Sequence, residues 1–205
     1  MSNVEQLRKE LEQSLNQLCQ DIGLIRIGHA DQFPFGWRKA AKGRTVWRIV
    51  EEIISQNLEN NRERYNLDTL FAAESEVGVY DFYGTLKSSQ QRFYVNVKSA
   101  VNGAKVSKDD ISKADKLLHF LKESNDELFI ATFVIEFNDD LSIRLNKCIV
   151  MPITWVPDVY VNPSNNGNLQ SSKCKSPETW IQRSREEFID VLQEEMNVAR
   201  RKKMK

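Results

Sequence analysis

The sequence predicts one α/β domain spanning residues 1–205, with a central mixed β-sheet flanked by helices and helical N- and C-terminal extensions. The chain has 205 residues, 40% apolar and 28% charged, which suits one well-packed domain and is short for two. Runs with the spacing of amphipathic helices alternate with β-rich runs. Residues 128–137 (LFIATFVIEF) are almost continuously apolar, as in a central strand covered on both faces.

The composition limits the classes of function. The 29 basic and 29 acidic residues balance, which neither indicates nor excludes a nucleic-acid partner, because a basic cleft can coexist with an acidic exterior. No apolar run approaches the roughly 20 residues that span a bilayer. The first residues (MSNVEQLRKELEQ) lack the apolar core of a signal peptide. We therefore expect a cytoplasmic protein without membrane contacts.

The cysteines and histidines do not have the spacing of a catalytic or metal site. Cys19, Cys148 and Cys174 are odd in number and far apart, so we expect reduced thiols without a catalytic role. His29 and His119 are also distant in sequence. A zinc site or a catalytic triad built on these histidines is therefore not expected.

The N-terminal segment predicts a helix followed by a basic loop. Residues 3–20 have apolar side chains at helical spacing over about two heptads. This length favours packing on the chain's own domain, with a dimer contact as the alternative. In the irregular loop 23–44, four cations lie near three aromatic residues: Arg38, Lys39, Lys42 and Arg44 near Phe33, Phe35 and Trp37. The loop either grips DNA phosphates or is a solvated basic loop with its aromatics tucked into the core.

Residues 45–59 predict a second amphipathic helix, and residues 67–73 a short strand. Glu51 and Glu52 lie at or near the margin of the helix's apolar face. Glu51 is closer to the apolar stripe at about 100° per residue. Glu74 and Glu76 follow the short strand.

Residues 77–83 and 92–99 predict the two strands of a hairpin, with Gly84, Ser88 and Ser89 in the connection. In the second strand Phe93, Val95 and Val97 alternate with Tyr94, Asn96 and Lys98, so Asn96 and Lys98 share one face. Asp81 lies in the middle of the first strand, where an acidic residue is a poor strand former. A carboxylate, a second oxygen ligand and a lysine on paired strands can hold Mg²⁺ and orient a water.

This arrangement resembles the PD-(D/E)XK nuclease superfamily, to which many type II restriction endonucleases belong. Asp81 matches the acid of the first strand, and Asn96-Val97-Lys98 occupies the place of (D/E)-X-K. The chain departs from the motif twice, because Tyr80 replaces the proline and Asn96 replaces the second acid. Some restriction enzymes of this family also carry Asn or Gln there. The resemblance covers a core of about residues 44–137 and implies a restriction-endonuclease-like fold.

The resemblance implies a Mg²⁺-dependent type II restriction endonuclease that hydrolyses double-stranded DNA at a specific short sequence. Asp81, Asn96 and Glu51 would bind the metal, and Lys98 would stabilise developing negative charge or position the attacking water. Members of the superfamily often carry a glutamate on the helix before these strands. Glu51 is favoured for that role, with Glu52, Glu74 and Glu76 as alternatives. A palindromic DNA site would favour a homodimer.

The chain after the hairpin predicts a loop at residues 100–106 and then a helix. Ser107-Lys-Asp-Asp110 resembles a capping box, and the apolar face follows it as Ile111, Ala114, Leu117, Leu118 and Leu121. Further expected DNA contacts are Ser99, Asn102 and Lys105. After residues 128–137, a turn at 138–141 leads to a pairing strand at 142–153.

Residues 151–176 form a polar, Asn-rich segment that is long for a passive connection. Asn and Gln can read adenine and Lys can read guanine, so the candidates for DNA recognition here are Asn165, Asn166, Asn168, Gln170 and Lys173. The alternative is a flexible surface loop. Ser176-Pro177 predicts the start of a last helix, with Trp180, Ile181, Phe188, Val191, Leu192 and Met196 as its apolar face. The tail ARRKKMK is basic and either contacts DNA or frays.

Three competing interpretations remain. The first is a repair or recombination nuclease that reads DNA structure instead of sequence. The second is a non-catalytic DNA-binding or assembly module, for which Asn96 is the main argument. The third is an ordinary α/β protein in which Asp81 and Lys98 form an exposed cross-strand ion pair, worth at most about 1 kcal/mol.

Overall fold

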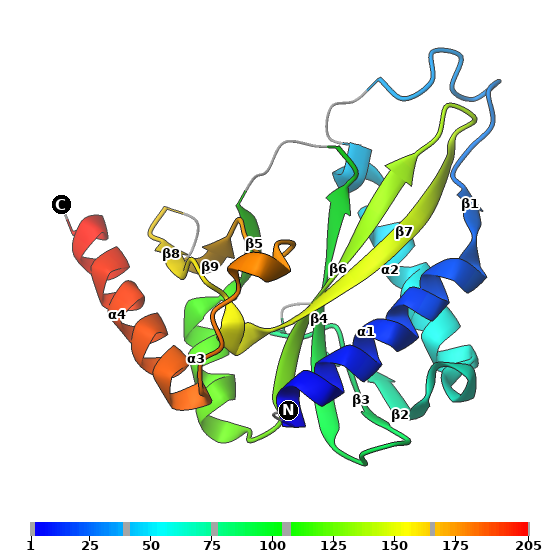
Figure 1. Cartoon of the computed structure of the whole chain (residues 1–205). Coiled ribbons are helices and arrows are strands. Elements are labelled where there is room, and N and C mark those ends of the chain that lie inside the picture. Colours follow the sequence, from blue (N-terminus) through cyan, green and yellow to red (C-terminus); the bar gives the residue numbers. More distant parts are fainter. Residues whose placement is uncertain (1–2, 39–41, 75–77, 104–107, 165–166, 205) are drawn as a thin grey trace.

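The computed structural model describes residues 3–38, 42–74, 78–103, 108–164 and 167–204 (Figure 1). Its helices are α1 (Asn3–Ile22), α2 (Lys42–Asn60), α3 (Ala114–Glu123) and α4 (Arg185–Lys203). Its strands are β1 (Leu24–Arg26), β2 (Leu67–Ala72), β3 (Phe82–Leu86), β4 (Arg92–Val101), β5 (Asp109–Lys113), β6 (Glu127–Phe137), β7 (Ser142–Pro152), β8 (Tyr160–Asn162) and β9 (Asn168–Ser171). No helix in these ranges is long and apolar enough to cross a membrane.

The strands form a six-stranded sheet in the order β1-β7-β6-β4-β3-β2 and a small sheet in the order β5-β9-β8. In the larger sheet β4 and β6 are parallel, and the other neighbouring strands are antiparallel. All pairs in the small sheet are antiparallel. The larger sheet is therefore mixed and lies between helices, which confirms the predicted fold class.

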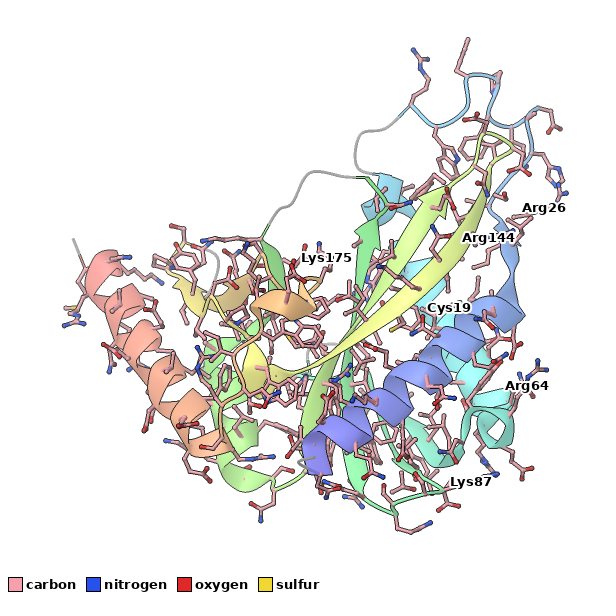
Figure 2. The ribbon with its side chains drawn as sticks, in the orientation of Figure 1. Cys19, Arg26, Arg64, Lys87, Arg144 and Lys175 are labelled. Atoms are coloured by element: carbon pink, nitrogen blue, oxygen red, sulfur yellow. The ribbon has the colours of Figure 1, made fainter. Side chains whose placement is uncertain are left out.

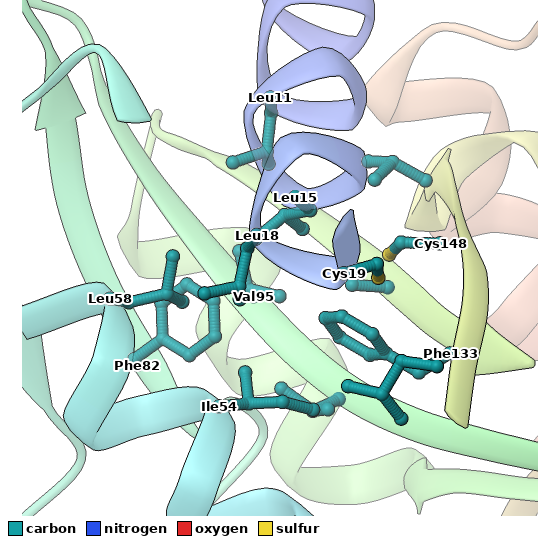
Figure 3. Close-up of a cluster of buried hydrophobic side chains, with 14 of the residues drawn as sticks. Leu11, Leu15, Leu18, Cys19, Ile54, Leu58, Phe82, Val95, Phe133 and Cys148 are labelled. Carbon is teal, nitrogen blue, oxygen red and sulfur yellow. The ribbon is translucent and has the colours of Figure 1, made fainter. Parts of the chain in front are cut away.

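Two apolar cores lie on opposite faces of the larger sheet. α1 and α2 pack on one face, where Leu11, Leu15, Ile54, Leu58 and Phe133 are buried together (Figure 3). α3, α4 and the small sheet pack on the other face. Successive residues of β6 enter opposite cores, so this strand is covered on both faces as its apolar run predicts.

The hairpin differs from the expectation in where its first strand lies. β3 begins at Phe82, so Asp81 precedes the strand, and Gly84 lies inside the strand rather than in the connection. A Cβ on Gly84 would lie 2.2 Å from the carbonyl oxygen of Thr69 on β2. Close pairing of β2 and β3 therefore requires glycine here, and a turn was wrongly inferred from this residue. Val77, the first residue of the expected strand, lies outside the described ranges.

Two expected helix starts were also wrong. Residues 109–113 form β5, and α3 begins at Ala114 after Lys113, whose side chain makes no cap hydrogen bond. Near the C-terminus, Pro177–Thr179 makes only one 3₁₀ turn, and α4 begins at Arg185. Ser184 and Glu187 form a reciprocal capping box there, which satisfies more helix N–H groups than Ser176-Pro177 can. Trp180 and Ile181 therefore precede the helix.

The Asn-rich segment is more regular than expected. Its residues form a 3₁₀ turn at Ile153–Trp155 and the strands β8 and β9, which pair with β5 to form the small sheet. Asp158 accepts hydrogen bonds from the backbone of Ser172 and from the hydroxyls of Ser171 and Ser172. The expectation of a flexible loop is therefore wrong for the described part of this segment.

Candidate active site

Asp81 is held against β4 by both its backbone and its side chain. Its backbone N–H donates to the carbonyl of Val95 at 2.8 Å. Its carboxylate accepts the N–H of Val97 at 2.5 Å. The carboxylate is therefore fixed beside the Asn96-Val97-Lys98 triplet, although Asp81 itself precedes β3.

Glu51 reaches the same place from α2. The helix buries Val46, Val50, Ile54 and Leu58 in the core, and Glu51 follows Val50 at the margin of that face. Its carboxyl lies within hydrogen-bonding reach of the Asp81 carboxyl and 3.3 Å from the Arg48 guanidinium. Burial and the negative charge of Asp81 raise the pKa of Glu51, against the opposing effect of Arg48. Proximity of two carboxyl groups favours the protonated form of one of them, and a cation between them would favour both ionised forms.

Lys98 is half-buried on β4 and feels the charge of four carboxylates. Burial lowers the pKa of Lys98, because its charged form loses hydration, while Asp81, Glu51, Asp109 and Asp110 act in the opposite direction. The first two carboxylates come from α2 and the approach to β3, and the last two come from β5. Lys98 is thus influenced by charges on both the larger sheet's side and the small sheet. This environment is unlike the exposed ion pair of the third interpretation.

The acids of β5 were not predicted as part of the site. Asp109 forms an ion pair with Lys175 at 3.0 Å, and Asp110 accepts a hydrogen bond from Gln170 at 2.6 Å. Figure 2 shows Lys175 beside the small sheet, away from Arg26 and Arg144 near β1 and β7. The acids were missed because the sequence around them resembles a helix cap.

Asn96 shares one face of β4 with Lys98, as the alternation predicts, and is only 5% exposed. Its amide nitrogen donates to the carbonyls of Val79 at 2.8 Å and Ile111 at 3.2 Å. Its amide oxygen is the only buried side-chain nitrogen or oxygen of the described ranges without a hydrogen-bond partner.

A pocket of about 510 Å³ opens beside the two carboxyls, lined by residues of α2 that include Glu51 and by Ala72, Ala73 and Asp81. The carboxylates of Glu51 and Asp81 therefore share a pocket, and the half-buried Lys98 lies on the neighbouring strand β4.

The carboxylates of Glu51 and Asp81, which line one pocket, fit a hard cation such as Mg²⁺. Two carboxylates within hydrogen-bonding reach repel each other when both are ionised, and the Asn96 oxygen lacks a donor. Mg²⁺ is commonly held by one or two carboxylates and completes its coordination with water. Within the described ranges no three His, Cys, Asp or Glu side chains gather as a metal site, so any third protein oxygen would come from another residue type, such as the amide of Asn96.

The other candidate acids are placed differently. Glu52 is exposed and accepts a hydrogen bond from Gln56, and Glu74 is exposed beyond β2. Glu76 lies outside the described ranges. Of the four candidates, Glu51 is the one that the structure places against Asp81.

The basic loop is anchored by Trp37. The Trp37 indole N–H donates to the carbonyl of Asn138 at 3.1 Å, and its ring packs edge-on against Phe137 at 5.0 Å. Phe35 is 74% exposed, and the Arg38 guanidinium lies 4.8 Å from the centre of its ring. Trp37 thus fits the interpretation of aromatics packed on the core, whereas Phe35 and Arg38 face solvent.

The remaining candidate DNA contacts are distributed over several elements. Ser99 lies on β4, Asn102 follows β4, Asn168 and Gln170 lie on β9, and Lys173 follows β9. Lys42 and Arg44 belong to the first turn of α2. Lys39, Lys105, Asn165 and Asn166 lie outside the described ranges.

The three cysteines are buried free thiols and lie apart from the carboxylate pair. Burial raises the pKa of Cys19 to about 12 and that of Cys174 to about 11. Such thiols are poor nucleophiles at neutral pH.

Comparison with solved structures finds the same overall fold in the NlaIV restriction endonuclease. The TM-score is 0.53 at 12% sequence identity, and the match covers 97% of this chain and 88% of that chain. No protein family model matches the sequence, and no curated protein matches it. At this level of identity the likeness establishes a restriction-endonuclease-like fold.

Proposed function

We propose that this protein is a Mg²⁺-dependent type II restriction endonuclease, which hydrolyses phosphodiester bonds in double-stranded DNA at a specific short sequence. The observation that carries the proposal is the Glu51–Asp81 carboxylate pair, which lines a pocket and acts electrostatically on the half-buried Lys98. The likeness to a solved restriction endonuclease supports the same activity.

Each residue of the site has a role in this reaction. Glu51, Asp81 and Asn96 would hold the Mg²⁺, which when bound polarises the scissile phosphate and lowers the pKa of a bound water. The Val97 N–H fixes the Asp81 carboxylate. The Lys98 ammonium stabilises the negative charge that develops on the phosphate or positions the attacking water. Water adds to phosphorus and one P–O bond breaks, leaving a phosphomonoester and a hydroxyl.

Double-stranded DNA is the proposed partner. The basic loop carries Arg38 beside the exposed Phe35, and the small sheet carries Asn168 and Gln170. Figure 1 shows these two parts of the chain on opposite sides of β6. Arg38 suits phosphate contacts, and side-chain amides suit base edges in the major groove. A homodimer would match a palindromic DNA site, and a mass measurement in solution checks this expectation.

The test is cleavage of phage or plasmid DNA by the purified protein, with Mg²⁺ and with a chelator. Asp81→Ala and Lys98→Ala are expected to lose at least about 10²-fold in rate, because each removes a group that acts on the reacting phosphate or its metal. Asp68→Ala, at an exposed position on β2, serves as the control and is expected to cleave normally.

The outcomes separate the competing functions. Discrete Mg²⁺-dependent fragments, lost in both variants, support a sequence-specific nuclease. Cleavage only at branched or damaged DNA would support the structure-selective nuclease instead. DNA binding without cleavage would support the non-catalytic module. The structural argument for that module is that no third acidic side chain joins Glu51 and Asp81 in the described ranges. Intact and unbound DNA on every substrate would contradict the proposal.

A further inference from the structure

Asn96 donates to two backbone carbonyls that, among the described residues, lie outside the strand pairing. Val79 lies before β3, outside the strand ladders. Ile111 is the extra residue of a β-bulge in β5, because Asp110 and Ser112 take successive partners on β9. Both residues are buried. A buried carbonyl that has lost water needs another donor, and the Asn96 amide supplies it for both.

The chemistry of the two partners fixes the orientation of the amide. Both partners are acceptors, so only the NH₂ group of Asn96 can face them. The amide oxygen therefore points away from the two carbonyls, which agrees with its lack of a hydrogen-bond partner. An ionised carboxylate at this position would have no donor, and its charge would face the negative ends of two carbonyl dipoles.

We propose that Asn96 is a positioning residue, whose amide ties the approach to Asp81 and the small sheet to β4. Val79 comes two residues before Asp81, so its tethered carbonyl sets the backbone path that brings the Asp81 carboxylate to the Val97 N–H. Ile111 adjoins Asp110, one of the carboxylates around Lys98. Of the measurements described below, only the Ca²⁺ affinity rests on the proposed function. The hydrogen bonds of Asn96 to Val79 and Ile111 do not depend on catalysis.

This role gives a reason for asparagine where the resemblance has an acid. If Asn96 were only a weakened metal ligand, Asn96→Asp would strengthen cation binding. If Asn96 is the tether, the same substitution removes a donor that two carbonyls need. The two roles therefore predict opposite effects of one substitution.

The experiment compares Asn96→Asp and Asn96→Ala with the wild type and with Asn125→Asp, an exposed control. Urea unfolding is followed from about pH 5 to about pH 8, and Ca²⁺ affinity is measured by calorimetry without DNA. Positioning partners of metal ligands typically change affinity by about 10–100-fold. We expect a Ca²⁺ affinity lowered to that extent in Asn96→Ala, and an affinity no higher than that of the wild type in Asn96→Asp.

The pH dependence of Asn96→Asp distinguishes a lost donor from a general loss of packing. Burial and the two carbonyls raise the pKa of the new carboxyl in the folded state, and its protonated form can donate one hydrogen bond. The loss of stability is therefore small below the pKa of the unfolded state, about 3.9, grows as pH rises from there to the folded pKa, and is constant above it. The loss in Asn96→Ala changes little with pH.

Lys98 follows Asn96 by two residues on β4, and the charges that act on Lys98 are those of Asp81 before β3, Glu51 on α2, and Asp109 and Asp110 on β5. They are present in every variant, so the difference from the wild type isolates the new carboxyl. An Asn96→Asp protein as stable as the wild type at every pH, with tighter Ca²⁺ binding, would overturn the proposal. If the wild type binds no Ca²⁺, the proposed metal site fails, and the unfolding curves still decide the tether.

Discussion

At the scale of single residues, Glu51 and Asp81 are closer than their charges favour. The pKa of Glu51 is raised by burial and by Asp81, so the folded state holds this proton to a higher pH than the unfolded state. The cost in stability is absent below the unfolded pKa, about 4.3. It grows as pH rises from that value to the folded pKa, and it is constant above the folded pKa. At neutral pH the pair therefore lowers the stability of the folded state, and the proposed cation would relieve this repulsion.

Glu51→Gln is expected to stabilise the metal-free protein and to inactivate it. The gain in the free energy of unfolding should be about 0.5–2 kcal/mol at neutral pH, in the usual range for a stabilising substitution, and should shrink as pH falls toward the unfolded pKa. Urea unfolding at several pH values and a cleavage assay check both effects. Glu59→Gln, at an exposed position on the same helix, should change neither. An equal or lower stability of Glu51→Gln at neutral pH would contradict the repulsion.

The sequence predicts some of these residues and not others. The alternation along β4 places Asn96 and Lys98 on one face, and helical geometry favours Glu51 over Glu52. Asp109 and Asp110 could not be found in this way. Their position beside Lys98 depends on pairing with β9, which a local pattern does not contain.

At the scale of elements, local signals predict the helices and long strands but not the small sheet. The apolar periods of α1 and α2 identify both helices, and the continuous apolar run identifies β6. In the small sheet Asp109 pairs with Ser171, far along the chain. No short window of sequence shows such a pairing, so β5 was taken as the start of α3.

Ser184 and Ser176 test the revised start of α4. The Ser184 hydroxyl accepts the N–H of Glu187, whereas the Ser176 side chain makes no cap hydrogen bond. Ser184→Ala should therefore lower the free energy of unfolding by about 1 kcal/mol, and Ser176→Ala should leave it nearly unchanged. Thermal unfolding measures the difference, at about 2–4 °C per kcal/mol for a chain of this size. Equal shifts in the two variants would argue against the capping box.

At the scale of the whole molecule, the fold class could be predicted because it depends on the order of elements and on one strand covered on both faces. Predicting the site requires more than the order of the elements. The site combines residues of α2, β4 and β5 with the segment before β3. Their convergence is a property of the complete fold, which explains why the sequence predicts the carboxylate pair but not the environment of Lys98.

A divalent cation is expected to stabilise the whole chain through this site. A ligand at 100 times its dissociation constant adds about 2.7 kcal/mol, which corresponds to a rise in Tm of about 5–11 °C. Ca²⁺ should produce this rise in the wild type and not in Asp81→Ala. Differential scanning calorimetry checks the prediction, with Asp68→Ala as the control. A similar rise in Asp81→Ala would place the bound cation elsewhere.

The small sheet also has a consequence for the order of folding. β5 belongs to the connection between the parallel strands β4 and β6, and β8 and β9 follow β7. The β6–β7 hairpin closes a short turn, whereas the small sheet must join segments that are distant along the chain. Contacts between segments that are distant along the chain form late in folding, because a long loop must be closed first. We therefore expect the amides of β9 to exchange with solvent sooner than those of β6, so the strand that carries Asn168 and Gln170 would open and adapt while the sheet beneath the carboxylates stays closed.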